Sequence, residues 1–178
     1  MNGSTLVKLC RECAHDVFEK RSPTPAYADA VARLLMGTAA TESLLTYRRQ
    51  GRFDFTSDRG AWGIWQTEQG SVSDGVKMLA ARPELRASVG RFIFGDQGDQ
   101  DLQGLIQMWT PGLLRLIHSS DRVACAFARL HYFRVSAPVP EFLEDQAAYY
   151  KEHYNTVAGK GSVEKYLADW RRLVEPAL

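Results

Sequence analysis

Long apolar runs, cysteines and an excess of either charge are all scarce in this sequence. No apolar stretch approaches the roughly 18 residues that a membrane-spanning helix needs. The formal net charge is +1 over 178 residues, and the basic residues are scattered rather than clustered, which is unlike a nucleic-acid-binding surface. The sequence therefore predicts a protein with no integral membrane segment and no nucleic-acid partner.

The cysteines are only three, Cys10, Cys13 and Cys125, which is too few for a disulfide framework. A structural zinc ion needs a second ligand pair beside Cys10 and Cys13, and Cys125 alone does not supply one. Leu6 and Leu9 fall at helical spacing with the first two cysteines. We therefore expect free thiols that act as small core residues, with no metal and no cofactor.

A secretory signal is also missing, because charges occur throughout the first twenty residues. The expectation is a protein made in the cytoplasm. A target outside the cytoplasm would then require delivery by another factor.

Amphipathic periodicity is present along most of the chain and predicts a single, mainly helical domain over residues 1–178. Thr24 is a suitable cap and Pro25 a suitable first residue for a largely apolar helix that reaches Glu42. A short β excursion at 52–56 is expected to pair with 62–67 as a small hairpin. Further helices are predicted over 5–20, from 71 or 73 to 81, 83–95, 102–109, 121–131, 141–153 and 162–174, with a short apolar segment over 111–117.

Glu42 is the first candidate for chemistry. Its helix is otherwise apolar, and Ala39, Leu44 and Leu45 are expected to desolvate its carboxyl group. Desolvation raises the pKa of a carboxyl, as a general acid at neutral pH requires. The alternative is a solvated glutamate with a structural role only.

Glu42-Ser43, followed by Gly60-Ala61-Trp62-Gly63-Ile64-Trp65-Gln66, resembles the lysozyme-like superfamily, which includes soluble lytic transglycosylases and goose-type lysozymes. The resemblance implies a lysozyme-like fold with a small β hairpin beside an active-site cleft. It implies that Glu42 is the catalytic acid, that the glycine-framed turn builds the cleft floor, and that Gln66 contacts the sugar. Ser43 and Trp62, within the matching motifs, join Gln66 as substrate-binding candidates, although Trp62 or Trp65 is expected in the core.

A tyrosine at the end of a late helix bonds the catalytic glutamate in lytic transglycosylases. Tyr132 ends a comparable predicted helix, although the Asn-Ala-Gly that follows the family's tyrosine is absent. The resemblance therefore suggests a site role for Tyr132, with a core or rim tyrosine as the alternative. The run from Tyr149 to Gly161 is similar to one in phage-encoded lysozyme-like virion proteins, which implies a virion location and other phage virion proteins as partners.

A second carboxylate would separate a hydrolase from a transglycosylase, because a hydrolase that inverts needs a base to activate water. Asp54, Asp58 and Glu68 are the candidates, and Asp58 and Glu68 resemble acidic positions of goose-type lysozymes. The alternative is that Asp58 caps a turn and that Glu68 is a solvated surface residue. We expect cleavage of the β-1,4 bond between N-acetylmuramic acid and N-acetylglucosamine in peptidoglycan. Two other hypotheses remain open, a catalytically inactive virion structural protein and a glycan-binding module of the same fold.

Overall fold

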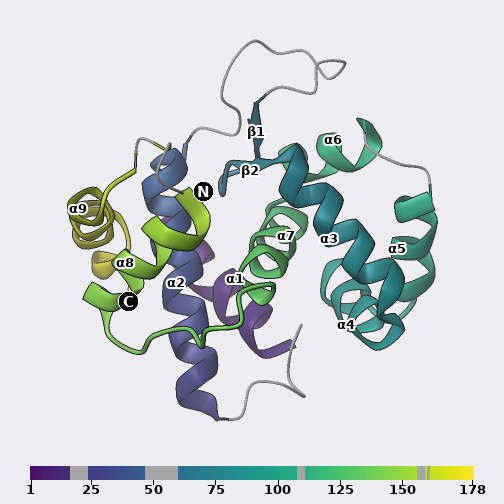
Figure 1. The fold of residues 1–178 in the computed structure, drawn as a ribbon, viewed down its shortest axis with the longest axis horizontal. Coiled ribbons are helices and arrows are strands. Elements are labelled where there is room, and N and C mark those ends of the chain that lie inside the picture. The colour runs from purple at the N-terminus through teal and green to yellow at the C-terminus, as the bar shows by residue number, and fades with distance from the viewer. Residues whose placement is uncertain (17–23, 47–59, 108–110, 156–158, 160) are drawn as a thin grey trace.

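The computed structural model describes residues 1–16, 24–46, 60–107, 111–155, 159 and 161–178. This part of the chain is mainly helical with one small hairpin (Figure 1), which confirms the predicted fold class. No helix in these ranges is long and apolar enough to cross a membrane. The helices are α1 (Gly3–Asp16), α2 (Pro25–Ser43), α3 (Gln69–Ala81), α4 (Pro83–Phe94), α5 (Gly98–Gln107), α6 (Pro111–Ser119), α7 (Asp121–Phe133), α8 (Leu143–Tyr150), the π-helical turn η2 (Lys151–Asn155), α9 (Val163–Leu173) and the 3-10 turn η3 (Glu175–Ala177).

Helix α2 is buried along nearly its whole length, as its apolar sequence predicts. It begins as predicted, because the Thr24 side chain accepts a hydrogen bond from the backbone N–H of Tyr27 at 3.2 Å and Pro25 occupies the first turn. It ends where Leu44 adopts a left-handed conformation with φ of 51°. A helix enclosed in this way has few places for a carboxylate, and Glu42 occupies its last turn.

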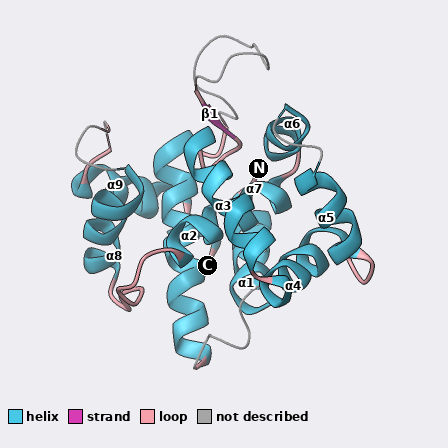
Figure 2. Ribbon diagram, turned by 45° about the vertical axis from the view of Figure 1, so that its right-hand side comes forward, coloured by secondary structure: helices cyan, strands magenta, loops and turns pink. Residues whose placement is uncertain are grey.

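The other helices form two groups on either side of α2 (Figures 1 and 2). Helices α8 and α9 pack against each other and against α2 on one side. Helices α3, α4, α5 and α6 lie on the other side, and α7 joins them to α1 and α2. The hairpin lies above α7 in both views, near the end of α2 that carries Glu42.

The hairpin is formed by β1 (Ala61–Trp62) and β2 (Thr67–Glu68), an antiparallel pair in which Trp62 faces Thr67. It therefore closes within the glycine-rich motif itself. The predicted partner at 52–56 lies outside the described residues. Gly63 has φ of 70°, and a Cβ there would lie 2.8 Å from the carbonyl oxygen of Ile117, so the turn requires glycine. The indole N–H of Trp65 donates to the carbonyl of Leu35 at 2.8 Å and fastens the turn to α2.

The three cysteines are fully buried free thiols, as the sequence predicts. Cys10 and Cys13 of α1 both contact Cys125 of α7, and burial raises the pKa of each thiol. A raised pKa keeps a thiol protonated, which suits a packing role between α1 and α7 better than a nucleophilic one.

Candidate functional site

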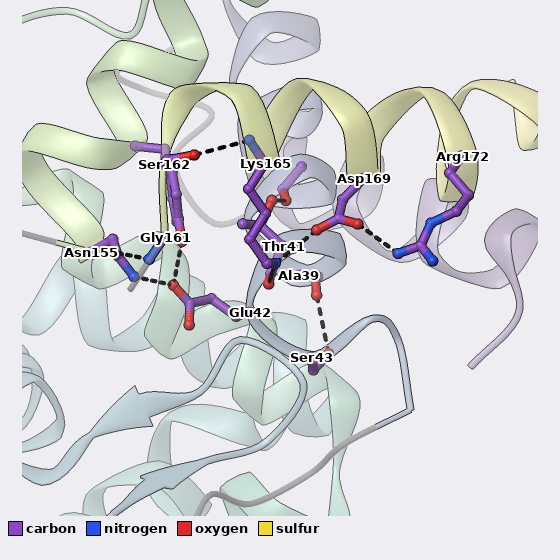
Figure 3. A network of polar contacts seen from close by, with 12 residues as sticks. Ala39, Thr41, Glu42, Ser43, Asn155, Gly161, Ser162, Lys165, Asp169 and Arg172 are labelled. Atoms are coloured by element: carbon purple, nitrogen blue, oxygen red, sulfur yellow. Dashed lines mark hydrogen bonds and ion pairs between the residues drawn. The ribbon is translucent and has the colours of Figure 1, made fainter. Parts of the chain in front are cut away.

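Glu42 lies half-buried in the last turn of α2, and one of its two carboxylate oxygens is held by two donors. Oε1 accepts a hydrogen bond from the hydroxyl of Tyr150 at 2.6 Å. It also accepts one from the side-chain amide of Asn155 at 3.1 Å (Figure 3). Within the described part of the chain, Oε2 accepts no hydrogen bond. The two oxygens therefore have different environments, and Oε2 is the one available to carry and donate a proton.

The pKa of Glu42 is raised above its ordinary value, and burial is the main cause. The hydrogen bonds from Tyr150 and Asn155 and the charge of Lys165 oppose this shift, because each stabilises the carboxylate, whereas the charge of Glu68 adds to it. Burial outweighs the opposing contacts. The carboxyl thus has the property expected of a general acid, and two donors are in place to stabilise the carboxylate left after proton transfer.

Tyr150 and Asn155 reach the same oxygen because the turn between them is a π-helix. Tyr150 is the last residue of α8, and Asn155 is the last residue of η2. A π-helix bonds each N–H to the carbonyl five residues back and turns the chain by a smaller angle per residue than an α-helix does, so side chains five apart lie closer to one face. A continued α-helix would point them about 140° apart, since each residue turns the chain by about 100°. The π-turn is therefore the local structure that assembles the donor pair.

Two contacts hold η2 in place from other elements. The hydroxyl of Tyr154 donates to the carbonyl of Trp65 at 2.8 Å, which ties η2 to the hairpin. Nε2 of His131 in α7 lies 2.7 Å from the carbonyl of His153, so Nε2 must carry a proton. Nδ1 of His131 faces a guanidinium nitrogen of Arg134 at 3.0 Å and must accept. His131 is therefore the neutral Nε2–H tautomer, in keeping with a pKa that burial lowers.

The orientation of the Asn155 amide is fixed by its oxygen. Oδ1 accepts from the backbone N–H of Gly161 at 2.9 Å and from the ammonium group of Lys151 at 3.1 Å, which leaves the NH2 group to face Glu42. A Cβ on Gly161 would lie 2.5 Å from the hydroxyl of Tyr150, and one on Gly159 would collide with the carbonyl of Asn155. These glycines let the chain wrap closely around the two donors.

Lys165 of α9 places a positive charge next to the turn of α2 that carries Glu42. Lys165 donates from its ammonium group to the carbonyl of Thr41, in the turn that carries Glu42, and to Asp169 at 2.7 Å (Figure 3). Asp169 also accepts from Arg172 at 2.6 Å. Lys165 therefore places a positive charge at the carbonyl end of α2, where it is favourable to the helix dipole and to an ionised Glu42.

Among the predicted catalytic residues, Glu42 and Glu68 lie in the described part of the chain and Asp58 lies outside it. Glu68 is exposed at the end of the hairpin, and its charge reaches Glu42. The predicted substrate contacts Ser43 and Gln66 are both buried. Ser43 donates to the carbonyl of Ala39 at 3.0 Å, inside its own helix.

Gln66 lies in the hairpin turn with φ of 49°, and its side-chain amide donates to the carbonyl of Gly63 at 2.7 Å. The side chain of Gln66 therefore stabilises the hairpin turn by a hydrogen bond inside it. At 4% exposure, it presents little surface to a ligand in this conformation.

Of the two roles that the sequence leaves open for Tyr132, the structure shows a core tyrosine, which does not bond to Glu42. Tyr132 is 2% exposed, and its hydroxyl shares a hydrogen bond of 2.7 Å with Thr38, one turn before Glu42. Tyr150 makes the contact instead. Trp62, predicted as a substrate contact, is 1% exposed and packs edge-on against His118, so it is a core residue.

Tyr150 and Asn155 were not among the sequence-predicted site residues, although both fall in the run that resembles phage virion proteins. One signal could have found Asn155, and none in the sequence identifies Tyr150. Tyr154-Asn155 is the only Tyr-Asn pair in the chain, and Gly159 and Gly161 follow it closely. That pattern is nearer to the Ala-Tyr-Asn-Ala-Gly of lytic transglycosylases than the end of α7 is.

Comparisons of the chain with protein-family models, with curated proteins and with solved structures gave no match.

Proposed function

We propose that this protein is a glycosidase that cleaves the β-1,4 bond between N-acetylmuramic acid and N-acetylglucosamine in peptidoglycan, with Glu42 as general acid. The observation that carries the proposal is the arrangement at Glu42. The carboxyl is half-buried, its pKa is raised, and Tyr150 and Asn155 bond one oxygen only. The resemblance of Glu42-Ser43 and the Gly60–Gln66 turn to lysozyme-like enzymes indicates that the substrate is peptidoglycan.

In the proposed reaction, Oε2 of Glu42 delivers its proton to the glycosidic oxygen as the bond to the sugar breaks and the sugar gains oxocarbenium character. Tyr150 and Asn155 keep Oε1 as the acceptor oxygen throughout, so the proton resides on Oε2. After transfer they stabilise the new carboxylate, which the surrounding burial would otherwise disfavour.

We further propose that water attacks the sugar, aimed by Glu68 or Asp58, which makes the enzyme a muramidase. The exposed position of Glu68, with its charge felt at Glu42, supports a second carboxylate near the reaction centre. A lytic transglycosylase would need no such group, because the 6-hydroxyl of the sugar would attack. Delivery with a phage virion, implied by the resemblance of the 149–161 run, belongs to the same proposal.

Digestion of purified cell walls tests this function. Clearing of wall turbidity, with soluble muropeptides identified by mass spectrometry, is the expected result, and walls left intact would contradict it. Products with reducing ends support hydrolysis. Products that end only in anhydro sugar would refute the role of the second carboxylate, and the double change Asp58→Asn with Glu68→Gln should stop a hydrolytic reaction while Glu42 remains.

A further inference from the structure

A cavity of about 820 Å³ lies away from Glu42, between the end of α3, the end of α7 and the segment 134–140. Tyr27 near the start of α2, Tyr132 of α7 and Tyr149 of α8 also line it. Tyr27 and Glu42 lie near opposite ends of α2, a helix of 19 residues and so about 28 Å long. Neither Glu42 nor its two donors, Tyr150 and Asn155, is in the lining, so the cavity is distinct from the site proposed above.

The cavity wall is strongly basic. Lys77, Arg82, Arg129 and Arg134 line it, and the described residues of the lining include no aspartate or glutamate. Asp74, just outside the lining, pairs with Lys77 at 3.8 Å and with Arg134. The described lining together with Asp74 thus carries four cationic side chains and one carboxylate, an excess of positive charge in a chain whose net charge is only +1.

The guanidinium groups of Arg82 and Arg129 lie over the ring of Phe133, at 5.7 Å and 5.8 Å from its centre. Arg82 is exposed at the cavity mouth, whereas Arg129 is only 3% exposed and is bonded to the side chain of Tyr27. The ring of Phe133 thus attracts both guanidinium groups, and Tyr27 also holds that of Arg129. A cation held away from bulk water interacts more strongly with an anion than a surface lysine does.

We propose that this cavity binds a small organic oxyanion, a carboxylate or phosphate group on an apolar or ring-shaped body. Guanidinium groups match the paired oxygens of both anions. The volume lies within the range of about 300–1,000 Å³ that is usual for small-molecule sites and is far larger than a bare phosphate requires. Tyr27, Phe133 and Tyr149 give the body of such a ligand aromatic surface to pack against.

Titration calorimetry on the whole chain tests this site with two ring-bearing anions, phenyl phosphate and hippurate, and with the neutral benzamide. Saturable binding of at least one anion, and none of benzamide at equal concentration, is expected. The stronger anion identifies the preferred head group. In the double variant Arg82→Gln with Lys77→Gln, Kd should rise at least tenfold. Both residues are exposed, so the change should leave the fold intact.

Three further variants test whether the anion binds in this cavity rather than elsewhere on the protein. Ala81→Glu places a carboxylate on the cavity wall and should abolish binding. Arg91→Gln removes an exposed arginine of α4 outside the cavity and should leave Kd unchanged, as should Glu42→Gln. The proposal is overturned if neither anion binds saturably, if benzamide binds equally well, or if Arg91→Gln weakens binding as much as the double variant does.

Discussion

At the scale of single residues, Glu42 has two kinds of surroundings with opposite effects on the stability of its charged form. Its surroundings disfavour the charged form, yet Tyr150 and Asn155 are positioned to bond that form. A side chain selected for stability alone would avoid the desolvation. The combination is what a proton donor needs, because such a group must hold its proton and then release it.

The first prediction is that Glu42→Gln unfolds at a higher denaturant concentration than the original protein at pH 7. The folded pKa of Glu42 is raised above 4.5, so the folded state binds more protons than the unfolded state as pH rises from 4.5 through the folded pKa. The free energy of unfolding therefore decreases as pH rises across that window, and it stays lower at neutral pH. Glutamine is neutral, and its oxygen can still accept from Tyr150 and Asn155.

Urea unfolding at pH 7 and at pH 4 measures this difference, and the advantage of Glu42→Gln should shrink at the lower pH. The exposed Glu68→Gln serves as the control, with little change at either pH. A Glu42→Gln protein that is less stable than the original at pH 7 would mean that the carboxylate is favoured at this position.

The second prediction concerns Tyr150→Phe, which removes one hydrogen bond to Oε1 of Glu42. That bond lowers the pKa of Glu42, so its loss should move the alkaline limb of the pH–activity profile to higher pH. The lost bond should also cost roughly 0.5–1.5 kcal/mol of stability. Tyr149→Phe is the matched control, because the hydroxyl of Tyr149 donates to the carbonyl of Ala137 instead. Equal shifts in the two variants would contradict the assignment.

At the scale of elements, the sequence predicts helices well where caps and apolar stripes coincide. Thr24 and Pro25 fix the start of α2 as predicted. Ser162 caps α9, at the start of the helix predicted over 162–174, by accepting from the N–H of Lys165 at 3.1 Å. Contacts between distant segments are what it does not reveal. The stretch 95–99, between the helices predicted over 83–95 and 102–109, already contains the start of α5 at Gly98. There α4 and α5 meet so closely that a Cβ on Gly98 would collide with Gly90.

The pair of donors to Glu42, Tyr150 and Asn155, depends on the π-turn η2, and no sequence pattern predicts this turn. A helix from 141 to 153 is predicted from its composition, but the wider turn of residues 151–155 is held by contacts with the hairpin and with His131. Because Tyr150 and Asn155 converge only through that turn, the sequence could identify Glu42 and could not identify its partners.

The third prediction is that Gly161→Ala reduces wall cleavage strongly while the protein stays folded. A Cβ at this position would lie 2.5 Å from the hydroxyl of Tyr150 and 2.8 Å from Cγ of Asn155, so both donors must move. Misplacing positioning groups by about an ångström can lower turnover by roughly 100-fold. Initial rates of turbidity loss, with circular dichroism to check folding, measure the effect.

Gly104→Ala is the matched control, because nothing lies within 4 Å of a Cβ at Gly104 in α5. Alanine in a helix interior should stabilise the protein by about 0.5–1 kcal/mol and leave activity unchanged. Full activity in Gly161→Ala would show that the contact of this glycine with Tyr150 and Asn155 does not matter for turnover.

At the scale of the whole molecule, Glu42 lies where segments far apart in the sequence meet. The end of α2, the turn η2 and the start of α9 converge there, and Tyr154 and Trp65 connect η2 to the hairpin. Composition and periodicity were enough to predict a mainly helical chain with a small hairpin. The meeting of these segments depends on tertiary contacts, which is why Tyr132 was expected at Glu42 and Tyr150 is found there.

The central claim is that Glu42 is the general acid, and wall digestion by Glu42→Gln tests it most directly. The purified variant and the original protein are compared at equal concentration on the same walls, by turbidity and by mass spectrometry of released muropeptides. Glutamine keeps the shape and the acceptor oxygen but has no proton to donate, so the rate should fall at least 100-fold, the usual lower contribution of a general acid. The account predicts a folded Glu42→Gln protein that releases almost no muropeptides, and a folded variant that clears walls at the original rate would contradict it.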